Sequence, residues 1–193
     1  MADFTPAFDR TLAHEGGFVN DPKDRGGETF MGITRRDHPD WPGWRVVDAA
    51  KGTAQFPHGL NEMPALQEMA SDLYKRRYWD RFDGDSLAHQ GVAEELFDTG
   101  VNMGVGRAVQ FLQRALNALN RGGSAWPDVG VDGDLGARTR EAMAACLGRG
   151  DGDVLLKALN VLQGAFYLGL TERDDSQERF VRGWFSRVTI SRG

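Results

Sequence analysis

The chain of 193 residues is long enough for one good hydrophobic core, and its 40% hydrophobic and 26% charged residues exclude a disordered or low-complexity protein. Its 23 basic and 28 acidic residues give a formal charge of −5, so we expect no general binding to nucleic acid, and any contact with an anionic wall polymer must be local. Cys146 is the single cysteine, which excludes an intramolecular disulfide and allows folding in a reducing compartment.

The amino-terminal region predicts a helix followed by a loop. Thr5 and Pro6 are typical of a helix start, and Gly16–Gly17 of a helix end, so we expect a helix over about residues 6–15. The composition of residues 18–34 predicts a long loop that leads into a short strand or hairpin.

The rest of the chain predicts irregular structure and then helices. Residues 37–59 carry Pro and Gly around Trp41 and Trp44, which predicts irregular structure, and each ring could stack on a sugar or pack in a core. Apolar residues at helical spacing predict helices near 63–78, 92–103, 109–119, 135–147, 153–170 and 176–188. The expected fold class is therefore α+β and predominantly α-helical, with one small β-hairpin region.

The sequence carries no targeting or membrane signal that we recognise. Residues 1–6 have neither a basic start nor an apolar core, and no stretch approaches the ~20 apolar residues of a membrane span. We expect no membrane insertion and cytoplasmic synthesis without a signal peptide. Two basic runs, one at 75–81 and one at 173–192, are either local wall contacts or solvated helix faces.

Glu15 is the first candidate for chemistry. Counted around a helix from Phe8, Leu12 lies about 40° and Glu15 about 20° away, so the carboxylate shares the buried face. Burial and the negative end of the helix dipole would both raise the pKa of Glu15. A general acid that works near neutral pH needs such a shift.

The loop after Glu15 holds further polar groups. Asp21, Asp24, Glu28 and Thr29 follow within 14 residues, and a Gly-rich loop can bring one carboxylate and one hydroxyl opposite the acid. Glycoside hydrolysis needs one protonated carboxyl and a second group for water or the cationic sugar. From spacing alone a second interpretation stands equally, in which the aspartates make Asx turns and Glu15 caps a neighbouring amide.

Residues 14–34 read HEGGFVNDPKDRGGETFMGIT. This string closely resembles the signature of glycoside hydrolase family 108, which is E-G-G, three residues, D-P-x-D-x-G-G-x-T, two residues, and G-I-T. The family comprises N-acetylmuramidases of phage endolysins, prophages and secretion-associated loci, with a lysozyme-like, mostly helical fold. The resemblance implies that Glu15 is the catalytic acid.

The resemblance extends along the chain. Residues 75–79 and 97–104 resemble further segments of the family, and 131–139 and 183–188 resemble its C-terminal half, a predicted peptidoglycan-binding region. It implies a lysozyme-like catalytic region at 1–104 and a helical C-terminal region at 105–193, packed as one compact unit. The sequence also resembles phage-type lysozymes, whose sites order a Glu, an Asp after eight residues and a Thr. Asp24 keeps that first gap, whereas the gap to Thr29 is one residue shorter.

These observations predict an N-acetylmuramidase whose cleft lies between the first helix and loop 18–34. Glu15 is expected to protonate the leaving oxygen. Asp24, or alternatively Asp21, stabilises the cationic sugar or positions water, and Thr29 donates or accepts a hydrogen bond in the same site. If Asp24 has that role, Asp21 is expected to contact the substrate. A lytic transglycosylase and a catalytically silent wall-binding or secretion-accessory protein are the alternatives. The expected partners are peptidoglycan and a holin or secretion protein for release.

We expect no cofactor. The four histidines share no ligand spacing, and His14 beside Glu15 is not an H-E-x-x-H pair, which disfavours a zinc enzyme. The two Asp-Gly-Asp sequences at 132–134 and 151–153 lack the Glu of an EF-hand, so helix capping is their expected role.

Overall fold

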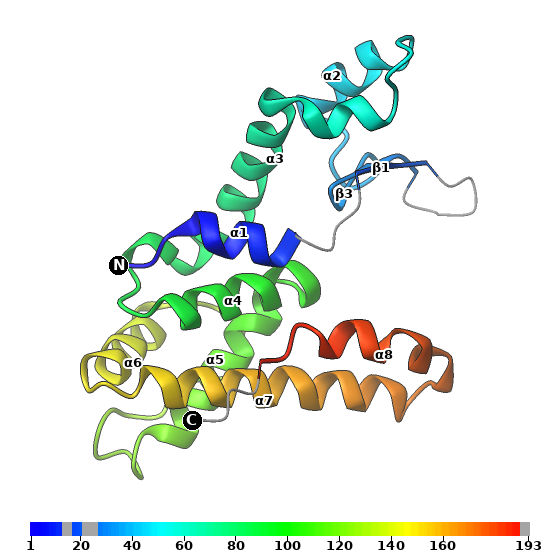
Figure 1. Ribbon diagram of the computed structural model, residues 1–193. Helices are drawn as coiled ribbons and strands as arrows, with labels where there is room; N and C mark the ends of the chain where they lie inside the picture. Colours follow the sequence, from blue (N-terminus) through cyan, green and yellow to red (C-terminus); the bar gives the residue numbers. More distant parts are fainter. Residues whose placement is uncertain (13–16, 21–26, 190–193) are drawn as a thin grey trace. The chain divides into compact units, whose positions relative to one another are not determined.

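The computed structural model describes residues 1–12, 17–20 and 27–189, and the chain divides into two compact units (Figure 1). The smaller unit is Phe8–Arg77, and the larger unit joins Met1–Ala7 to Tyr78–Gly193. The elements are α1 (Phe4–Leu12), β1 (Phe18–Val19), β2 (Thr29–Phe30), β3 (Ile33–Thr34), α2 (Gly43–Ala50), η1 (His58–Glu62), α3 (Pro64–Arg77), η2 (Trp79–Phe82), η3 (Gly84–Ser86), α4 (Gln90–Met103), α5 (Val105–Leu119), α6 (Ala137–Gly148), α7 (Gly152–Thr171), η4 (Asp175–Gln177) and α8 (Glu178–Phe185).

The described residues are mostly helical, and their strands form one small antiparallel sheet with the order β1-β2-β3. The predicted class, a predominantly helical α+β fold with a small hairpin, is confirmed. The predicted division into regions 1–104 and 105–193 is based on sequence motifs, whereas the two units described above are defined by compactness. The predicted division therefore stays a prediction.

The sheet of the smaller unit is fixed to helix α3 by its turn. Met31 and Gly32 have φ angles of 46° and 77° and form the two-residue connection between β2 and β3. The Tyr74 hydroxyl of α3 donates a hydrogen bond of 2.8 Å to the carbonyl of Met31. The final Gly of the motif therefore serves a tight turn that α3 holds in place.

Aromatic packing forms the core of the smaller unit. The Trp41 ring stacks on Phe30, with centroids 6.1 Å apart, and meets the edge of Trp44 at 5.1 Å. Trp44 and Val47 are buried on one face of α2. The irregular structure expected over 37–59 is thus wrong for α2, because burial of this apolar face outweighs the Pro and Gly that flank it. Both tryptophans are buried in this core, and Trp41 also lines a cavity of the smaller unit.

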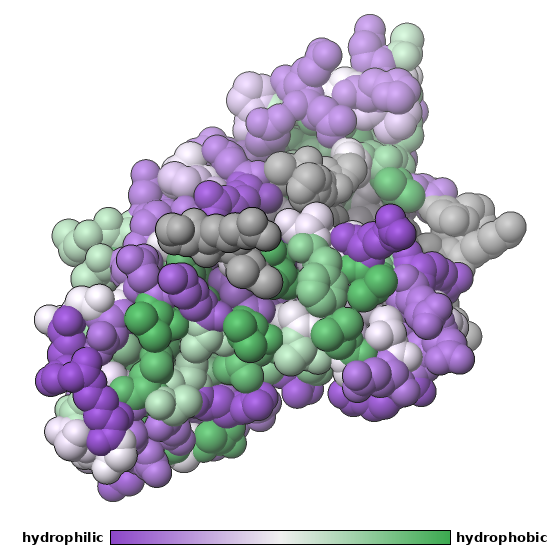
Figure 2. Space-filling view, turned by 60° about the horizontal axis from the view of Figure 1, so that its bottom comes forward, coloured by the Kyte–Doolittle hydropathy of each residue, from purple (hydrophilic) through white to green (hydrophobic). Residues whose placement is uncertain are grey.

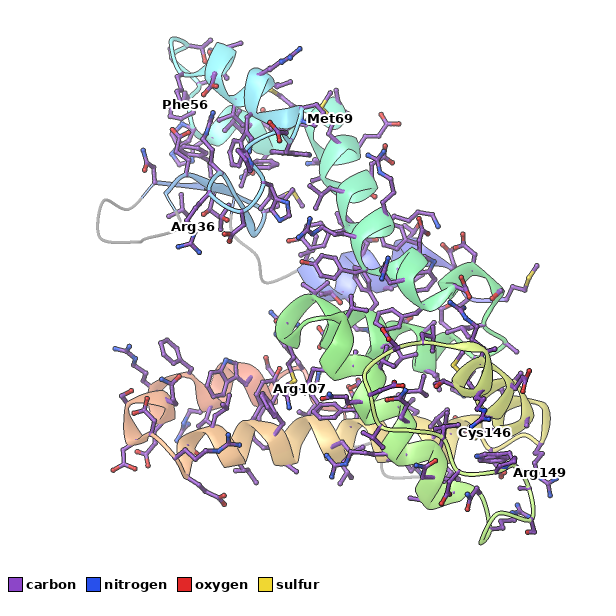
Figure 3. The ribbon with its side chains drawn as sticks, turned by 180° about the vertical axis from the view of Figure 1, so that it is seen from behind. Arg36, Phe56, Met69, Arg107, Cys146 and Arg149 are labelled. Carbon is purple, nitrogen blue, oxygen red and sulfur yellow. The ribbon has the colours of Figure 1, made fainter. Side chains whose placement is uncertain are left out.

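The core of the larger unit is built by three helices that contact one another, α4, α5 and α7. Leu96, Leu112 and Leu159 are among their fully buried side chains. The Arg107 guanidinium of α5 lies 4.8 Å above the Phe166 ring of α7 (Figure 3). This unit is therefore a helical bundle that is closed by apolar packing.

A buried polar cluster lies inside this bundle. Arg187 pairs with Asp98 of α4 at 3.0 Å, and both side chains are 15% exposed. The Gln163 amide of α7 donates to Asp98 at 3.0 Å and to the Thr99 hydroxyl at 3.2 Å. Burial, assisted by the nearby charge of Asp98, raises the pKa of Glu95 to about 8. The cluster joins α4, α7 and the chain after α8.

His89 joins the starts of α4 and α7. Its ring Nδ1 accepts a hydrogen bond of 3.2 Å from the backbone N–H of Val92, which caps α4. Its Nε2 lies 3.2 Å from a carboxylate oxygen of Asp153 in the first turn of α7. With Nδ1 accepting, the ring proton is on Nε2 and faces that carboxylate.

Three helix starts differ from the prediction. The cap of α1 is the Asp3 carboxylate, which accepts from the N–H of Thr5 at 2.9 Å, and the helix begins at Phe4. Asp132 accepts from the N–H of Asp134 at 2.9 Å within the loop, and it does not cap α6. Asp151 precedes α7 without a side-chain cap bond among the described residues. Helix capping is therefore wrong for Asp132, whereas Asp151 occupies the N-cap position of α7 without the side-chain bond.

Helix α7 is long and apolar enough, by length and composition alone, to cross a membrane, and a third of that stretch is buried. Its length corrects the expectation that no such stretch exists, although core helices of globular proteins pass the same test. Val154, Val161 and Leu168 follow each other at seven-residue spacing and are exposed. Figure 2 shows a band of hydrophobic residues on the face that it presents.

Candidate functional site

Three predicted site residues, Glu15, Asp21 and Asp24, lie outside the residues that the structure describes. Their roles stay predictions. The described chain supplies the elements on both sides of them. Helix α1 ends before Glu15, and strands β1 and β2 precede and follow the segment 21–26.

Thr29 is the predicted site residue within the described chain. It lies in β2, half-buried, and pairs with Val19 of β1 and Thr34 of β3. Its hydroxyl donates a long bond of 3.4 Å to the carbonyl of Gly27. Regular pairing on both sides fixes its backbone, while the weak bond leaves the hydroxyl able to take a stronger partner.

Glu28, next to Thr29, is held by two cations. Its carboxylate lies 2.7 Å from the Arg35 guanidinium and 2.5 Å from the Lys51 ammonium. Both cations also contact Asp48, and they hold the pKa of that carboxyl at about 2, with the Arg35 hydrogen bond as the largest cause. The Arg35 guanidinium lies 4.5 Å above the Trp44 ring. The glutamate of G-G-E-T therefore ties the sheet to α2.

The second glycine of E-G-G has a packing role. A Cβ atom on Gly17 would lie 2.5 Å from the side-chain amide of Asn61 in η1. The carbonyl of Asn61 accepts a bond of 2.5 Å from the Gln67 amide of α3, so the chain around Asn61 is anchored. A side chain at position 17 would force the Asn61 side-chain amide to move.

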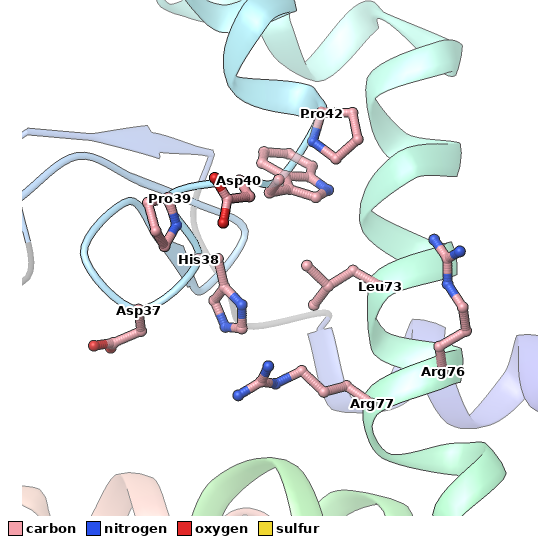
Figure 4. Close-up of a pocket in the computed structure, with 9 residues that line it drawn as sticks. Asp37, His38, Pro39, Asp40, Pro42, Leu73, Arg76 and Arg77 are labelled. Atoms are coloured by element: carbon pink, nitrogen blue, oxygen red, sulfur yellow. The ribbon is translucent and has the colours of Figure 1, made fainter.

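The smaller unit contains a cavity of about 380 Å³ between α3 and the segment before α2 (Figure 4). Arg76, Arg77 and Leu73 line it from α3, and His38 and Trp41 from the facing segment. In Figure 4 the His38 ring and the Arg77 guanidinium point toward one another, whereas the Asp37 carboxylate points away.

The electrostatics of this cavity favour polar or anionic groups. Burial, assisted by the positive charge of Arg77, lowers the pKa of His38, so its imidazole is neutral near pH 7. The indole N–H of Trp41 is already bonded to the carbonyl of Met69 at 3.2 Å, and only its carbon face remains for a ligand. The cavity thus combines guanidinium donors, a neutral imidazole and an apolar floor.

Sequence reasoning missed Asn61 and His38 as parts of this region. The basic run 75–81 was interpreted as either wall contact or a solvated face, and the structure adds that Arg76 and Arg77 line a cavity. Among residues 1–12, 17–20 and 27–189, no three His, Cys, Asp or Glu side chains gather as a metal site would require.

The helical fold with its short sheet and the order of the motif residues 15–34 along the chain define a lysozyme-like glycoside hydrolase. The model of the Glycosyl hydrolase 108 family matches residues 8–104, about half of the chain, and the chain belongs to this family. A second model, described as a Predicted Peptidoglycan domain, matches residues 107–189. Together they make the protein a hydrolase that acts on peptidoglycan, with the bacterial cell wall as its substrate.

A solved structure supports this assignment. The chain is similar to the structure titled "Structure of Brucella abortus SagA", with 28% sequence identity and a TM-score of 0.59. The similarity covers 96% of this chain and 88% of that one. A comparison with curated proteins finds no match.

Proposed function

We propose that the protein is an N-acetylmuramidase, which hydrolyses the β-1,4 bond between N-acetylmuramic acid and N-acetylglucosamine. The observation that carries the proposal is the complete motif of residues 15–34 inside the region matched by the glycosyl hydrolase model. In this mechanism Glu15 protonates the oxygen that leaves C1 of N-acetylmuramic acid. Glycosidases of this kind need no metal or organic cofactor.

The second carboxylate is Asp24 or Asp21. Glu28, the remaining acidic residue of the motif after Glu15, is neutralised by Arg35 and Lys51 and is therefore a poor candidate. The second carboxylate steadies the cationic sugar or positions water. Thr29, at the start of β2, donates or accepts a hydrogen bond in the same site.

The cavity beside α3 is a suitable subsite for an N-acetylated sugar. Arg76 and Arg77 offer donors for hydroxyl and carbonyl oxygens, while Leu73 and the Trp41 carbon face suit the ring C–H groups and the acetyl methyl. Arg77→Gln should therefore raise KM several-fold and change kcat little, because binding away from the reacting bond is lost equally in ground and transition states.

The biological setting that we propose rests on analogy with the family. We infer cytoplasmic synthesis and action on the wall after release, as expected for a phage or prophage endolysin or for a secretion-associated muramidase. A holin or a secretion protein would provide that release.

Analysis of the reaction products tests the chemistry. Purified peptidoglycan is digested, reduced with borohydride and examined by mass spectrometry. We expect reducing N-acetylmuramic acid ends, one water heavier than 1,6-anhydro ends. Anhydro ends would make the enzyme a lytic transglycosylase, reducing N-acetylglucosamine ends a glucosaminidase, and no products a silent wall-binding protein. Each of these three results overturns the proposal.

A further inference from the structure

Helix α7 presents an apolar stripe to solvent along most of its length. Val154, Val161 and Leu168 are the large side chains of this stripe, and each is about half exposed or more. Ala158 and Ala165 lie between them on the same face, half-buried and exposed respectively. The five positions alternate spacings of four and three residues, which is the pattern of the a and d positions of a coiled coil. The stripe therefore has the spacing that packs against another helix.

The rest of α7 argues against a membrane as the occupant of this stripe. Asn160 and Gln163 are buried side chains of the same helix, and the Gln163 amide donates to Asp98 of α4 at 3.0 Å. In a membrane span these amides would leave their partners and enter lipid, which is costly. A protein helix is the better match.

The stripe is complementary to itself when a second copy lies antiparallel. Large and small side chains alternate along it, so when Val161 lies opposite Ala165 of the second copy, Ala158 lies opposite Leu168. Each large side chain then packs over a small one, which allows two helices to approach closely. The same pairs recur on the other side of the two-fold axis, as a symmetric dimer requires.

The charges at the ends of the stripe fit the same arrangement. Lys157 and Glu172 are both exposed, and neither has an ion-pair partner within the part of the chain that the structure describes. In the antiparallel register Glu172 of the second copy lies opposite Val154, one turn from Lys157, so the ammonium can reach the carboxylate. Two such pairs form by symmetry. A parallel second copy would place like charges opposite each other, which is unfavourable.

We propose that α7 pairs with α7 of a second copy in this antiparallel register, and that the protein is a homodimer. A single helix face is smaller than the ~800 Å² per partner of a standard interface, so the dimer is weak, with a Kd of about 10 µM or above. The interface lies outside the motif of residues 15–34, and its formation is independent of the proposed function.

Sedimentation equilibrium with the intact chain tests the dimer. Val161→Lys places a charge at the centre of the stripe and should raise Kd by about tenfold or more. Val131→Lys makes the same change at an exposed valine outside α7 and is the matched control, which should leave Kd unchanged. Thermal melts check that both variants are folded.

A charge exchange tests the ends of the stripe. Lys157→Glu faces two like charges across the dimer and should raise Kd by roughly threefold or more. The double variant Lys157→Glu with Glu172→Lys should restore the Kd of wild type, because it exchanges the two signs and keeps both pairs.

Cysteine variants test the register. A mixture of Ala158→Cys and Leu168→Cys chains should form a mixed disulfide dimer under mild oxidation, because these positions face each other. Either variant alone would hold its two cysteines about 15 Å apart along the axis, too far for a disulfide. Native Cys146 is buried and does not compete.

Four outcomes would overturn the proposal. They are a wild-type chain that stays monomeric well above the expected Kd, equal Kd values for Val161→Lys and Val131→Lys, no recovery in the charge exchange, and faster disulfide formation by either cysteine variant alone than by the mixture. A monomer that binds phospholipid vesicles through Val161 would assign the stripe to a lipid surface and would also overturn it. These measurements read mass and cross-links, so failure of the muramidase assay leaves them unaffected.

Discussion

The two units hold their charged residues in different places. In the smaller unit Glu28 is 16% exposed, but the charged residues around it at the edge of the sheet, Arg35, Asp48 and Lys51, are 33%, 48% and 38% exposed. In the larger unit Asp98 of α4 and Arg187, which follows α8, are both 15% exposed. Exposed pairs contribute up to about 1 kcal/mol each, whereas loss of one partner of a buried pair costs several kcal/mol.

The two units should respond differently to substitution, the smaller one in turnover and the larger one in the free energy of unfolding. The smaller unit has strands of two residues and carries the motif of residues 15–34, and its structure depends on turn geometry, aromatic packing and surface ion pairs. The larger unit has long helices around a buried polar cluster. Substitutions in the motif should therefore change turnover, and substitutions in the cluster should change the free energy of unfolding.

The largest effect is expected for Glu15→Gln, since the amide keeps the volume but cannot donate the proton. Turnover on purified peptidoglycan should fall by ~10²-fold or more. The matched control is Glu28→Gln, the same substitution in the same motif, which breaks two ion pairs and should lower thermal stability while folded enzyme keeps its turnover. Glu15→Gln activity within tenfold of wild type would remove this residue from the mechanism.

The second carboxylate and its neighbour Thr29 are tested by three alanine variants. If Asp24 acts with Thr29, Asp24→Ala and Thr29→Ala each lower turnover by roughly tenfold or more with little change in melting temperature. Asp21→Ala should act through the loop. The reverse pattern, with Asp21→Ala inactive but folded and Asp24→Ala active, would assign the second role to Asp21.

Arg187→Gln tests the larger unit. It leaves the partly buried Asp98 without its cation, and we expect a loss of about 2 kcal/mol and of roughly 6 °C in melting temperature. Arg182→Gln, on the exposed side of α8, is the control and should change neither value. Equal melting temperatures for the two variants would show that the buried pair contributes no more than a surface charge.

Glu95 gives a pH-dependent prediction. Its pKa of about 8 in the folded protein exceeds the ordinary value of 4.5, so the folded state binds the extra proton between these values. The free energy of unfolding should therefore fall as pH rises from about 4.5 to about 8. Glu95→Gln should remove this part of the decline, measured as the difference in melting temperature between pH 5 and pH 8.5. An identical decline in both proteins would contradict the assigned pKa.

The smallest effect is expected from chelation. Because the proposed mechanism uses carboxylates alone, EDTA should leave turnover unchanged. Inactivation that one added metal reverses would require a ligand set that involves residues outside the described ranges.

Local patterns in the sequence predicted the long helices well. The helix expected near 63–78 is α3, and the one near 153–170 is α7. The prediction failed where tertiary contacts determine the secondary structure. The Pro and Gly that flank α2 indicate a loop, but packing of Trp44 against Trp41 stabilises a helix there. The spacing of the motif residues within 15–34 could be read directly from the sequence.

Contacts between separate elements could not be predicted in the same way. The pairing of Glu28 with Lys51, the approach of Asn61 to Gly17 and the meeting of His38 with Arg77 all join residues from separate elements. Spacing along the chain carries no information on such contacts, so the cavity beside α3 was missed although its basic run had been noticed.

His89 sets the axial alignment of two helices. Its Nδ1 accepts a hydrogen bond from the first turn of α4, and its Nε2 lies beside the Asp153 carboxylate of α7. Both interactions can form together only when the first turns of α4 and α7 lie side by side. One inserted residue between Asp151 and Asp153 would rotate the carboxylate by about 100° and move it about 1.5 Å along the axis. At position 89, asparagine could accept the capping hydrogen bond of α4, and glutamine could reach the Asp153 carboxylate, but neither side chain could make both contacts. Length variation in the turn before α7 should therefore be poorly tolerated, and so should any side chain at Gly152, because a Cβ atom there would clash with the His89 ring.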